Sequence, residues 1–405
     1  MKPFGIADHT GSASLQGTCG RSLQRHSLCL ASPACSTIAQ FRLKLQETHI
    51  VNFRKHHDLT YVPSQGVNLV YGPNGSGKTN ILEAIHYCSL AKGMNRSLDK
   101  ECLKFDADYF LLKSRFTDKS GRETAVKVTY EKSREKKIAV NNEELKKFSG
   151  IIGKIPCVTF TPYDLGIVNG SPQERRRFID TALSQSYRTY LDNILQYRRV
   201  LQQRNALLAH YAEDRQITTS FDIWTEKLAH LGASIIQERL SFIDRLENVV
   251  KPLYTELGLE EIPGFRYHPS SGRITGEMSK EDIEASILNR FDDIATQEIV
   301  RQQTLIGPHR DDMIFTVNGI DARKYASQGQ IRTFLIALKL ALQRMIGEII
   351  GESPVFLLDD LFSELDENRI DRILHILEGS GQSIITTTEK RAFGAAECIN
   401  IEEIV

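Results

Sequence analysis

The sequence has little cysteine, no excess of either charge and no long apolar run. Its seven cysteines form no CxxC pair and have no histidine at ligand spacing, which argues against a zinc site or a disulfide framework. The 51 Lys and Arg residues equal the 51 Asp and Glu residues, so any nucleic-acid contact must come from a local patch. No stretch approaches the roughly 18 apolar residues of a membrane helix. We therefore expect a cytoplasmic protein that does not enter a membrane.

The first 38 residues differ in composition from the rest. They are rich in Ser, Ala, Gly and Cys, and Asp8 is their only acidic residue. Their apolar positions are too broken for a secretory signal, and they resemble an organelle transit peptide only faintly. We expect residues 1–40 to be a disordered extension, or the product of a start codon upstream of the true one.

A glycine-rich loop at residues 72–79 lies between an apolar run and a helix-like run. Its glycines let the backbone approach a polyphosphate, and the following helix adds its positive N-terminal end. Lys78 would reach the β- and γ-phosphates, and Thr79 would hold Mg²⁺. A turn that only joins a strand to a helix does not explain this Lys-Thr pair. The predicted phosphate-binding residues are Gly72, Pro73, Asn74, Gly75, Ser76, Gly77, Lys78 and Thr79.

An apolar strand at residues 354–358 is followed by two acids. A carboxylate at such a strand end can hold Mg²⁺ through water, and the next acid can orient an attacking water molecule. We assign the metal role to Asp359 and the catalytic role to Asp360. An isolated Asp pair would more often lie in a surface turn, but the upstream phosphate loop favours a Walker B element.

A second candidate phosphate site lies upstream of this strand. Ser327 and Gly329 open an apolar helix expected at residues 331–345. Free amides and the helix dipole favour an anion there, although SQGQ alone would more often be an ordinary N-cap. One chain cannot easily bring both loops to one phosphate. The Walker B element and the Ser-Glu-Leu-Asp turn at 363–366 favour the phosphate-site interpretation.

The hydrophobic patterns divide the chain into three parts. Residues 41–170 and 301–405 carry strand patterns, whereas residues 171–300 are helical. Gly and Pro are absent from 173 to about 211, which predicts one long helix, and a second is expected from about Ser220 as its N-cap. Each could run on the order of 35 residues, or about 50 Å. The predicted fold class is α/β, with a P-loop head split by an insertion that forms a compact helical lobe.

The order Walker A, Ser-x-Gly-Gln signature, Walker B and D-loop resembles that of the ABC-type ATPases related to SMC proteins. Several further segments are similar to one family of this class, the RecF family. These segments are Asn52-Phe53-Arg54, Gly170-Ser171-Pro172, Arg175-Arg176-Arg177-Phe178-Ile179-Asp180, Gln203-Arg204-Asn205, Gly307-Pro308-His309-Arg310-Asp311-Asp312 and the LLDDLFSELD stretch. The resemblance covers residues 41–405.

The resemblance implies an ATP-dependent homodimer. Two subunits would face head to tail, so that a nucleotide bound by Lys78 and Thr79 of one is closed by Ser327 of the other. It also implies binding to double-stranded and gapped DNA, recombinational repair and replication restart, and cooperation with RecR and RecO in loading RecA. ATP and Mg²⁺ would be the cofactors of a slow, DNA-dependent hydrolysis that acts as a switch.

Some positions depart from related patterns. Transporter ATPases carry a glutamate where this chain has Asp360, although RecF proteins share the aspartate. They also carry a histidine where this chain has Thr386-Thr387-Thr388, which leaves the γ-phosphate sensor open. Tyr163 stands where RecF relatives usually have an acid.

Basic residues could contact phosphate or DNA, or form a solvated face. Arg54, Lys92 and Arg96 are expected near the nucleotide. Of the three arginines at 175–177, one or two are expected to pair with Asp180 or Asp192. The tripeptide at 309–311 resembles a kinase motif without its context and is expected to be structural.

Three rival functions are weaker. An SMC-like structural protein would need long heptads and a CxxC hook between the Walker elements. A transporter ATPase subunit would need a transmembrane partner, and the helical segment after residue 170 speaks against it. A phosphotransferase would need an acceptor pocket that no motif identifies.

Overall fold

The computed structural model describes residues 43–404, apart from residues 96, 134, 212–218, 364, 391–393 and 395. The extension predicted at 1–40, Arg96 and Glu364 of the predicted D-loop lie outside the described residues. Within the described ranges, no helix has both the length and the apolar character needed to cross a membrane.

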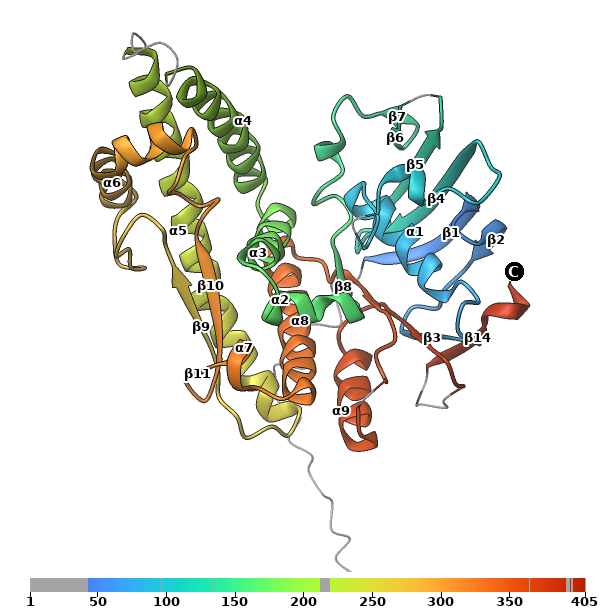
Figure 1. Ribbon diagram of the computed structural model, residues 1–405. Helices are drawn as coiled ribbons and strands as arrows, with labels where there is room; N and C mark the ends of the chain where they lie inside the picture. The colour runs from blue at the N-terminus through green and yellow to red at the C-terminus, as the bar shows by residue number, and fades with distance from the viewer. Residues whose placement is uncertain are drawn as a thin grey trace, which may run out of the picture.

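A five-stranded parallel sheet runs through the head in the order β14-β3-β13-β12-β8; Figure 1 labels β14, β3 and β8 of this sheet. The side chains of β12 alternate between two cores: Phe356 and Leu358 face one, and Val355 and Leu357 face the other. Because both faces are covered, every position needs an apolar residue, which explains the unbroken run in the sequence. The strands are β3 (Val67–Tyr71), β8 (Cys157–Phe160), β12 (Val355–Leu358), β13 (Ser383–Thr387) and β14 (Glu397–Asn400).

A six-stranded antiparallel sheet covers one side of the head in the order β2-β1-β4-β5-β6-β7. Helix α1 (Lys78–Leu90) contacts strands of both sheets. On β4, Phe110, Leu112 and Phe116 are buried, which matches a strand with one face on the core. The strands are β1 (Lys44–Phe53), β2 (His56–Tyr61), β4 (Tyr109–Thr117), β5 (Glu123–Glu131), β6 (Lys137–Val140) and β7 (Glu143–Glu144).

The helical region is inserted between β8 and β12 of the parallel sheet and packs beside the head (Figure 1). This confirms the predicted α/β head that is split by a helical insertion. The helices are α2 (Leu165–Asn169), α3 (Pro172–Ser186), α4 (Arg188–Tyr211), α5 (Thr219–Glu256), α6 (Lys280–Arg301), α7 (Ala322–Tyr325) and α8 (Gln328–Ile350). A small antiparallel sheet contains β9 (Pro263–His268), β10 (Asp312–Val317) and β11 (Ile320–Asp321), and α9 (Glu367–Glu378) follows β12.

Two helix predictions need correction. The single helix predicted from 173 to 211 is broken at Tyr187, whose backbone is extended at φ −131° and ψ 116°. The break separates α3 from α4, and next to it the Tyr190 hydroxyl on α4 donates a hydrogen bond of 2.5 Å to Asp180 on α3. The next helix, α5, begins at Thr219, so Ser220 lies inside it and is not its N-cap. At 38 residues α5 is about 57 Å long, which fits a lobe and not an extended arm.

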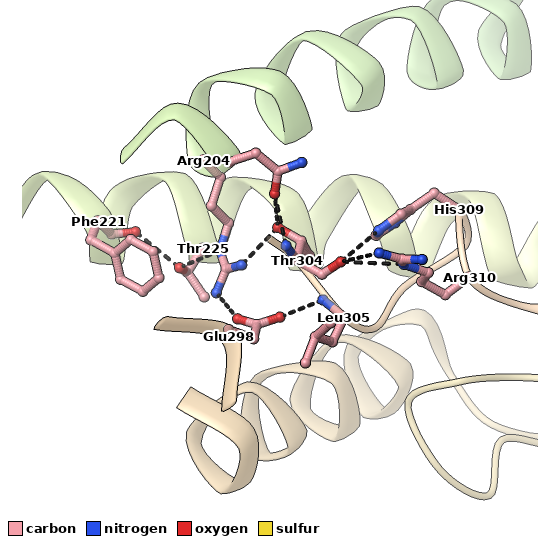
Figure 2. A network of polar contacts seen from close by, with 9 residues as sticks. Arg204, Phe221, Thr225, Glu298, Thr304, Leu305, His309 and Arg310 are labelled. Atoms are coloured by element: carbon pink, nitrogen blue, oxygen red, sulfur yellow. Dashed lines mark hydrogen bonds and ion pairs between the residues drawn. The ribbon is translucent and has the colours of Figure 1, made fainter. Parts of the chain in front are cut away.

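A buried ion pair joins the helices of the insertion (Figure 2). Arg204 on α4 and Glu298 on α6 are 1% and 0% exposed, and Nη2 lies 2.7 Å from Oε2. The guanidinium also donates to the Thr304 hydroxyl at 2.9 Å and lies 4.6 and 4.3 Å from the ring centres of Phe221 and Phe291. The Gln203-Arg204-Asn205 motif is therefore a structural junction.

Candidate nucleotide site

The loop at 72–79 joins β3 to α1, and its backbone requires glycine at two positions. Gly77 has φ 102°, and an added Cβ would lie 2.6 Å from the His56 ring. Gly72 has φ 151°, and an added Cβ would lie 2.6 Å from the Ile401 side chain. Glycine alone adopts such positive φ values without strain. The loop thereby presents the first amides of a 13-residue helix, which have no intrahelical partner and favour an anion.

Lys78 is folded over this loop. Its Nζ donates to the carbonyls of Gly72 at 2.7 Å and Pro73 at 2.8 Å. Burial lowers the pKa of Lys78, while the charges of Asp359 and Asp360 oppose that shift. An anion placed at the loop would favour the charged form of this buried ammonium.

Asp359 at the end of β12 accepts two hydroxyl hydrogen bonds. Thr79 Oγ1 and Thr386 Oγ1 each donate to Asp359 Oδ1 at 2.7 Å. Burial raises the pKa of Asp359, and the two hydroxyl donors oppose the shift. Mg²⁺ prefers hard oxygen ligands and commonly binds one or two carboxylates plus substrate phosphates. Thr79 and Asp359 supply such oxygens side by side, so these residues fit the ion.

These groups line one cavity of about 440 Å³ at the carboxyl edge of the parallel sheet. The wall formed by Walker A and Walker B contains Asn74, Gly75, Gly77, Lys78, Thr79, Asp359 and Asp360. Gly72, Pro73 and Ser76 belong to the same loop but are not among the described lining residues. The last two residues of β13, Thr386 and Thr387, and the next residue, Thr388, also line the cavity. Ligands of open α/β sheets bind at this edge.

Ser327 and Gly329 lie at the start of α8, and neither is among the described residues that line this cavity. Ser327 is the N-cap: its hydroxyl accepts from the Gln330 amide at 3.2 Å, and Gln330 Oε1 accepts from the Ser327 amide at 2.9 Å. The simple capping role considered for SQGQ is therefore present. An added Cβ at Gly329 would meet no described atom within 4 Å, so the helix start is open to a ligand.

Comparisons with known proteins agree with these features. The family model "RecF/RecN/SMC N terminal domain" matches residues 44–402. The DNA replication and repair protein RecF of Chlorobium phaeobacteroides is 56% identical over 363 residues, which cover 90% of this chain and 100% of that protein. The chain belongs to the RecF family.

Solved structures support the same assignment. The recombination mediator protein RecF-ATP of the RecFOR pathway is 34% identical with a TM-score of 0.82, and the match covers 89% of this chain and 98% of that one. An Smc head domain of Pyrococcus furiosus, 15% identical with a TM-score of 0.51, covers 86% of this chain and 90% of that one and is similar in fold. The RecF resemblance read from the motifs is thus confirmed.

The arginines of the RecF-like segment at 175–177 do not pair as predicted. Arg175 Nε lies 2.7 Å from Asp312, and Arg176 donates to the Asp311 carbonyl at 2.6 Å. Asp180 instead accepts from Arg239 at 2.8 Å. The prediction assumed contacts within one helix, whereas α3 packs against β10 and α5. The other expected acceptor, Asp192, pairs with Arg188.

The other basic residues have varied positions. Arg54 donates through Nε to Glu83 at 2.8 Å, with Glu83 only 3% exposed, so this RecF-family arginine holds the start of the head together. Lys92 lines a neighbouring groove between the head and α3. The tripeptide at 309–311 has a structural role, as predicted, because buried Asp311 accepts hydrogen bonds from Tyr267 and Ser270.

Sequence reasoning missed two side chains that contact the phosphate loop. Lys55 Nζ donates to the Gly75 carbonyl at 2.7 Å and lines the cavity. His56 Nε2 lies 3.0 Å from the Gly77 carbonyl, and burial lowers the pKa of this imidazole. Both follow Asn52-Phe53-Arg54 directly, so the family motif could have directed attention to them. Tyr163, 73% exposed, lines the same cavity.

Proposed function

We propose that this RecF-family chain is an ATP-gated DNA-binding protein of recombinational repair and replication restart that works in the cytoplasm. Two copies with bound ATP close on double-stranded DNA beside a gap or junction, and slow, DNA-dependent hydrolysis opens them again. RecR and RecO are its partners in loading RecA. The names of the relatives and the intact Walker elements support this proposal.

The observation that carries the proposal is a divided site. Lys78, Thr79 and Asp359 share one cavity, whereas Ser327 lies at an open helix start outside it. A nucleotide held at the cavity therefore exposes its γ-phosphate to a second copy of the chain, whose Ser327 and Gly329 add a second helix N-terminus. ATP thereby becomes part of the dimer interface. Loss of the γ-phosphate removes the shared contact.

Each residue has a defined role in this scheme. The loop amides and Lys78 bind and orient the phosphates. Thr79 and Asp359 hold Mg²⁺, which, when bound, neutralises developing phosphate charge. Asp360 orients the attacking water. We divide the chain into an ATPase lobe of residues 41–170 and 301–405 and a helical lobe of residues 171–300.

The test compares wild type with Lys78→Met. ATP-dependent binding to gapped duplex DNA is measured at fixed salt, because salt alone changes DNA affinity strongly, and molecular mass is measured in parallel. We expect ATP to convert only the wild type into a dimer that retains DNA. If ATP changes neither the mass nor the DNA affinity of the wild type, the proposed function is wrong and only the fold assignment stands.

A further inference from the structure

Asp360 has a backbone conformation that other residues must hold in place. Its φ is 50°, in the left-handed region that residues with a Cβ rarely adopt. Its amide donates to Thr386 Oγ1 at 3.0 Å, and its carbonyl accepts from Arg332 Nη2 at 2.7 Å. Such a conformation persists only where the surroundings fix it. The direction of the Asp360 carboxylate therefore depends on contacts to its peptide groups.

Arg332 holds this peptide from the signature helix. It is 5% exposed and lies on α8, five residues after Ser327, or about 7.5 Å along the helix axis. Its Nη2 also donates to Ser363 Oγ at 2.7 Å, at the first residue of the predicted D-loop. Arg332 is not among the described residues that line the nucleotide cavity, and its hydrogen bond to the Asp360 carbonyl links it to a residue that does.

We propose that Arg332 is a positioning residue for ATP hydrolysis, which makes the orientation of Asp360 depend on the position of α8. This inference rests on the proposed function, in which Ser327 of α8 contacts the nucleotide of the partner subunit. Because α8 moves as a rigid unit, a contact between Ser327 and the partner's nucleotide also fixes the position of Arg332. Arg332 then fixes the Asp360 peptide, and hydrolysis in one subunit follows closure by the other.

The test separates hydrolysis from binding in Arg332→Gln. We expect kcat to fall about 10²-fold, the scale of a misplaced catalytic group, while ATP affinity and the ATP-driven dimer stay within about twofold of wild type, since Arg332 does not touch the nucleotide. Arg332→Lys, which keeps one charged donor, should recover part of kcat. Arg344→Gln is the matched control on α8, because Arg344 pairs with Glu256 at the surface, and it should keep wild-type kcat.

Two further readouts distinguish positioning from a general structural role. Adding Arg332→Gln to Asp360→Asn should lower kcat no further, because both changes remove the same function. The wild-type rate per subunit should rise with protein concentration as dimers form, whereas the rate of Arg332→Gln should stay flat. If Arg332→Gln fails to fold, Ser363→Ala removes the second acceptor of Arg332 and should lower kcat with unchanged ATP affinity.

The outcomes are distinct. A wild-type kcat in a folded Arg332→Gln or Ser363→Ala protein overturns the inference. So does a lower kcat in the Arg332→Gln, Asp360→Asn double variant than in Asp360→Asn alone. A fall in ATP affinity that explains the whole loss of ATPase activity also overturns it. These results leave the proposed function intact, because wild type still dimerises on ATP. A wild type that neither dimerises nor hydrolyses ATP overturns both.

Discussion

Thr79 Oγ1 donates a hydrogen bond to Asp359 Oδ1 at 2.7 Å, although 280 positions separate the two residues in the sequence. The contact joins the first turn of α1 to the end of β12 and so unites the two halves of the split head. The two oxygens lie beside the loop at 72–79, where they would fit Mg²⁺. The proposed nucleotide site therefore needs both halves of the head, which the helical insertion separates in the sequence.

Asp359→Asn should stabilise the ATP-free protein at neutral pH and abolish hydrolysis. Burial raises the pKa of Asp359 above its ordinary value of 3.8. Relative to the unfolded chain, the folded protein is therefore most stable with respect to this group below about pH 3.8, where Asp359 is protonated in both states. This part of the unfolding free energy is lost as pH rises through the higher folded-state pKa. Urea unfolding at pH 7 should show a larger unfolding free energy for the variant than for wild type, and the difference should shrink towards pH 4. Equal stabilities at pH 7 would contradict this reasoning.

Glu298→Gln should destabilise the protein by about 3 kcal/mol, because it leaves the Arg204 guanidinium buried without its carboxylate. Chemical denaturation measures this loss. Glu348→Gln is the control, since the Arg245–Glu348 pair is 41% and 59% exposed and should contribute at most about 0.5 kcal/mol. Similar small losses in both variants would show that the junction does not depend on the charge pair.

Asp360→Asn should bind ATP and stay dimeric but hydrolyse ATP at least about 10²-fold more slowly, the usual contribution of a positioned acid–base group. The amide keeps the size of the side chain, so nucleotide binding should be spared. Single-turnover hydrolysis and sizing with ATP measure the two properties separately. A variant that remains monomeric with ATP would contradict the assigned role.

Ser327→Arg should spare ATP binding and prevent ATP-driven dimerisation. Ser327 lies outside the cavity of its own chain, so its replacement leaves that cavity unchanged, whereas the long side chain blocks the open helix start. Titration with a fluorescent ATP analogue checks binding, and light scattering checks mass. If the variant dimerises with ATP as wild type does, the hypothesis that the partner's Ser327 closes the nucleotide site is wrong.

The parts of the site that the sequence predicted are those set by local chemistry. The phosphate loop and the acids after β12 could be located because glycine at positive φ, a helix start and a strand end each leave a short pattern. Thr79 and Asp359 were assigned to the same ion from two separate patterns, and they meet because parallel strands end at one edge of the sheet.

Contacts decided by packing between distant elements were not predictable. Arg175 pairs with Asp312, 137 positions away, and not with an acid on its own helix. No Gly or Pro lies near the helix break at Tyr187, so the sequence did not predict it. Nor does any sequence pattern predict that Arg332 donates to the Asp360 carbonyl. These features depend on how the helices of the insertion pack on the sheets. Such packing involves residues far apart in the sequence, so no short sequence pattern predicts it.

The most direct test of the divided site mixes Lys78→Met with Ser327→Arg and measures mass with ATP. In the mixed dimer one composite site is intact, because Lys78 comes from one subunit and Ser327 from the other. We predict that neither variant dimerises alone and that the mixture forms a heterodimer at higher protein concentration than wild type requires. A mixture that stays monomeric at about 10 times the wild-type midpoint, where the loss of one site worth about 1.4 kcal/mol would be offset, would contradict closure in trans.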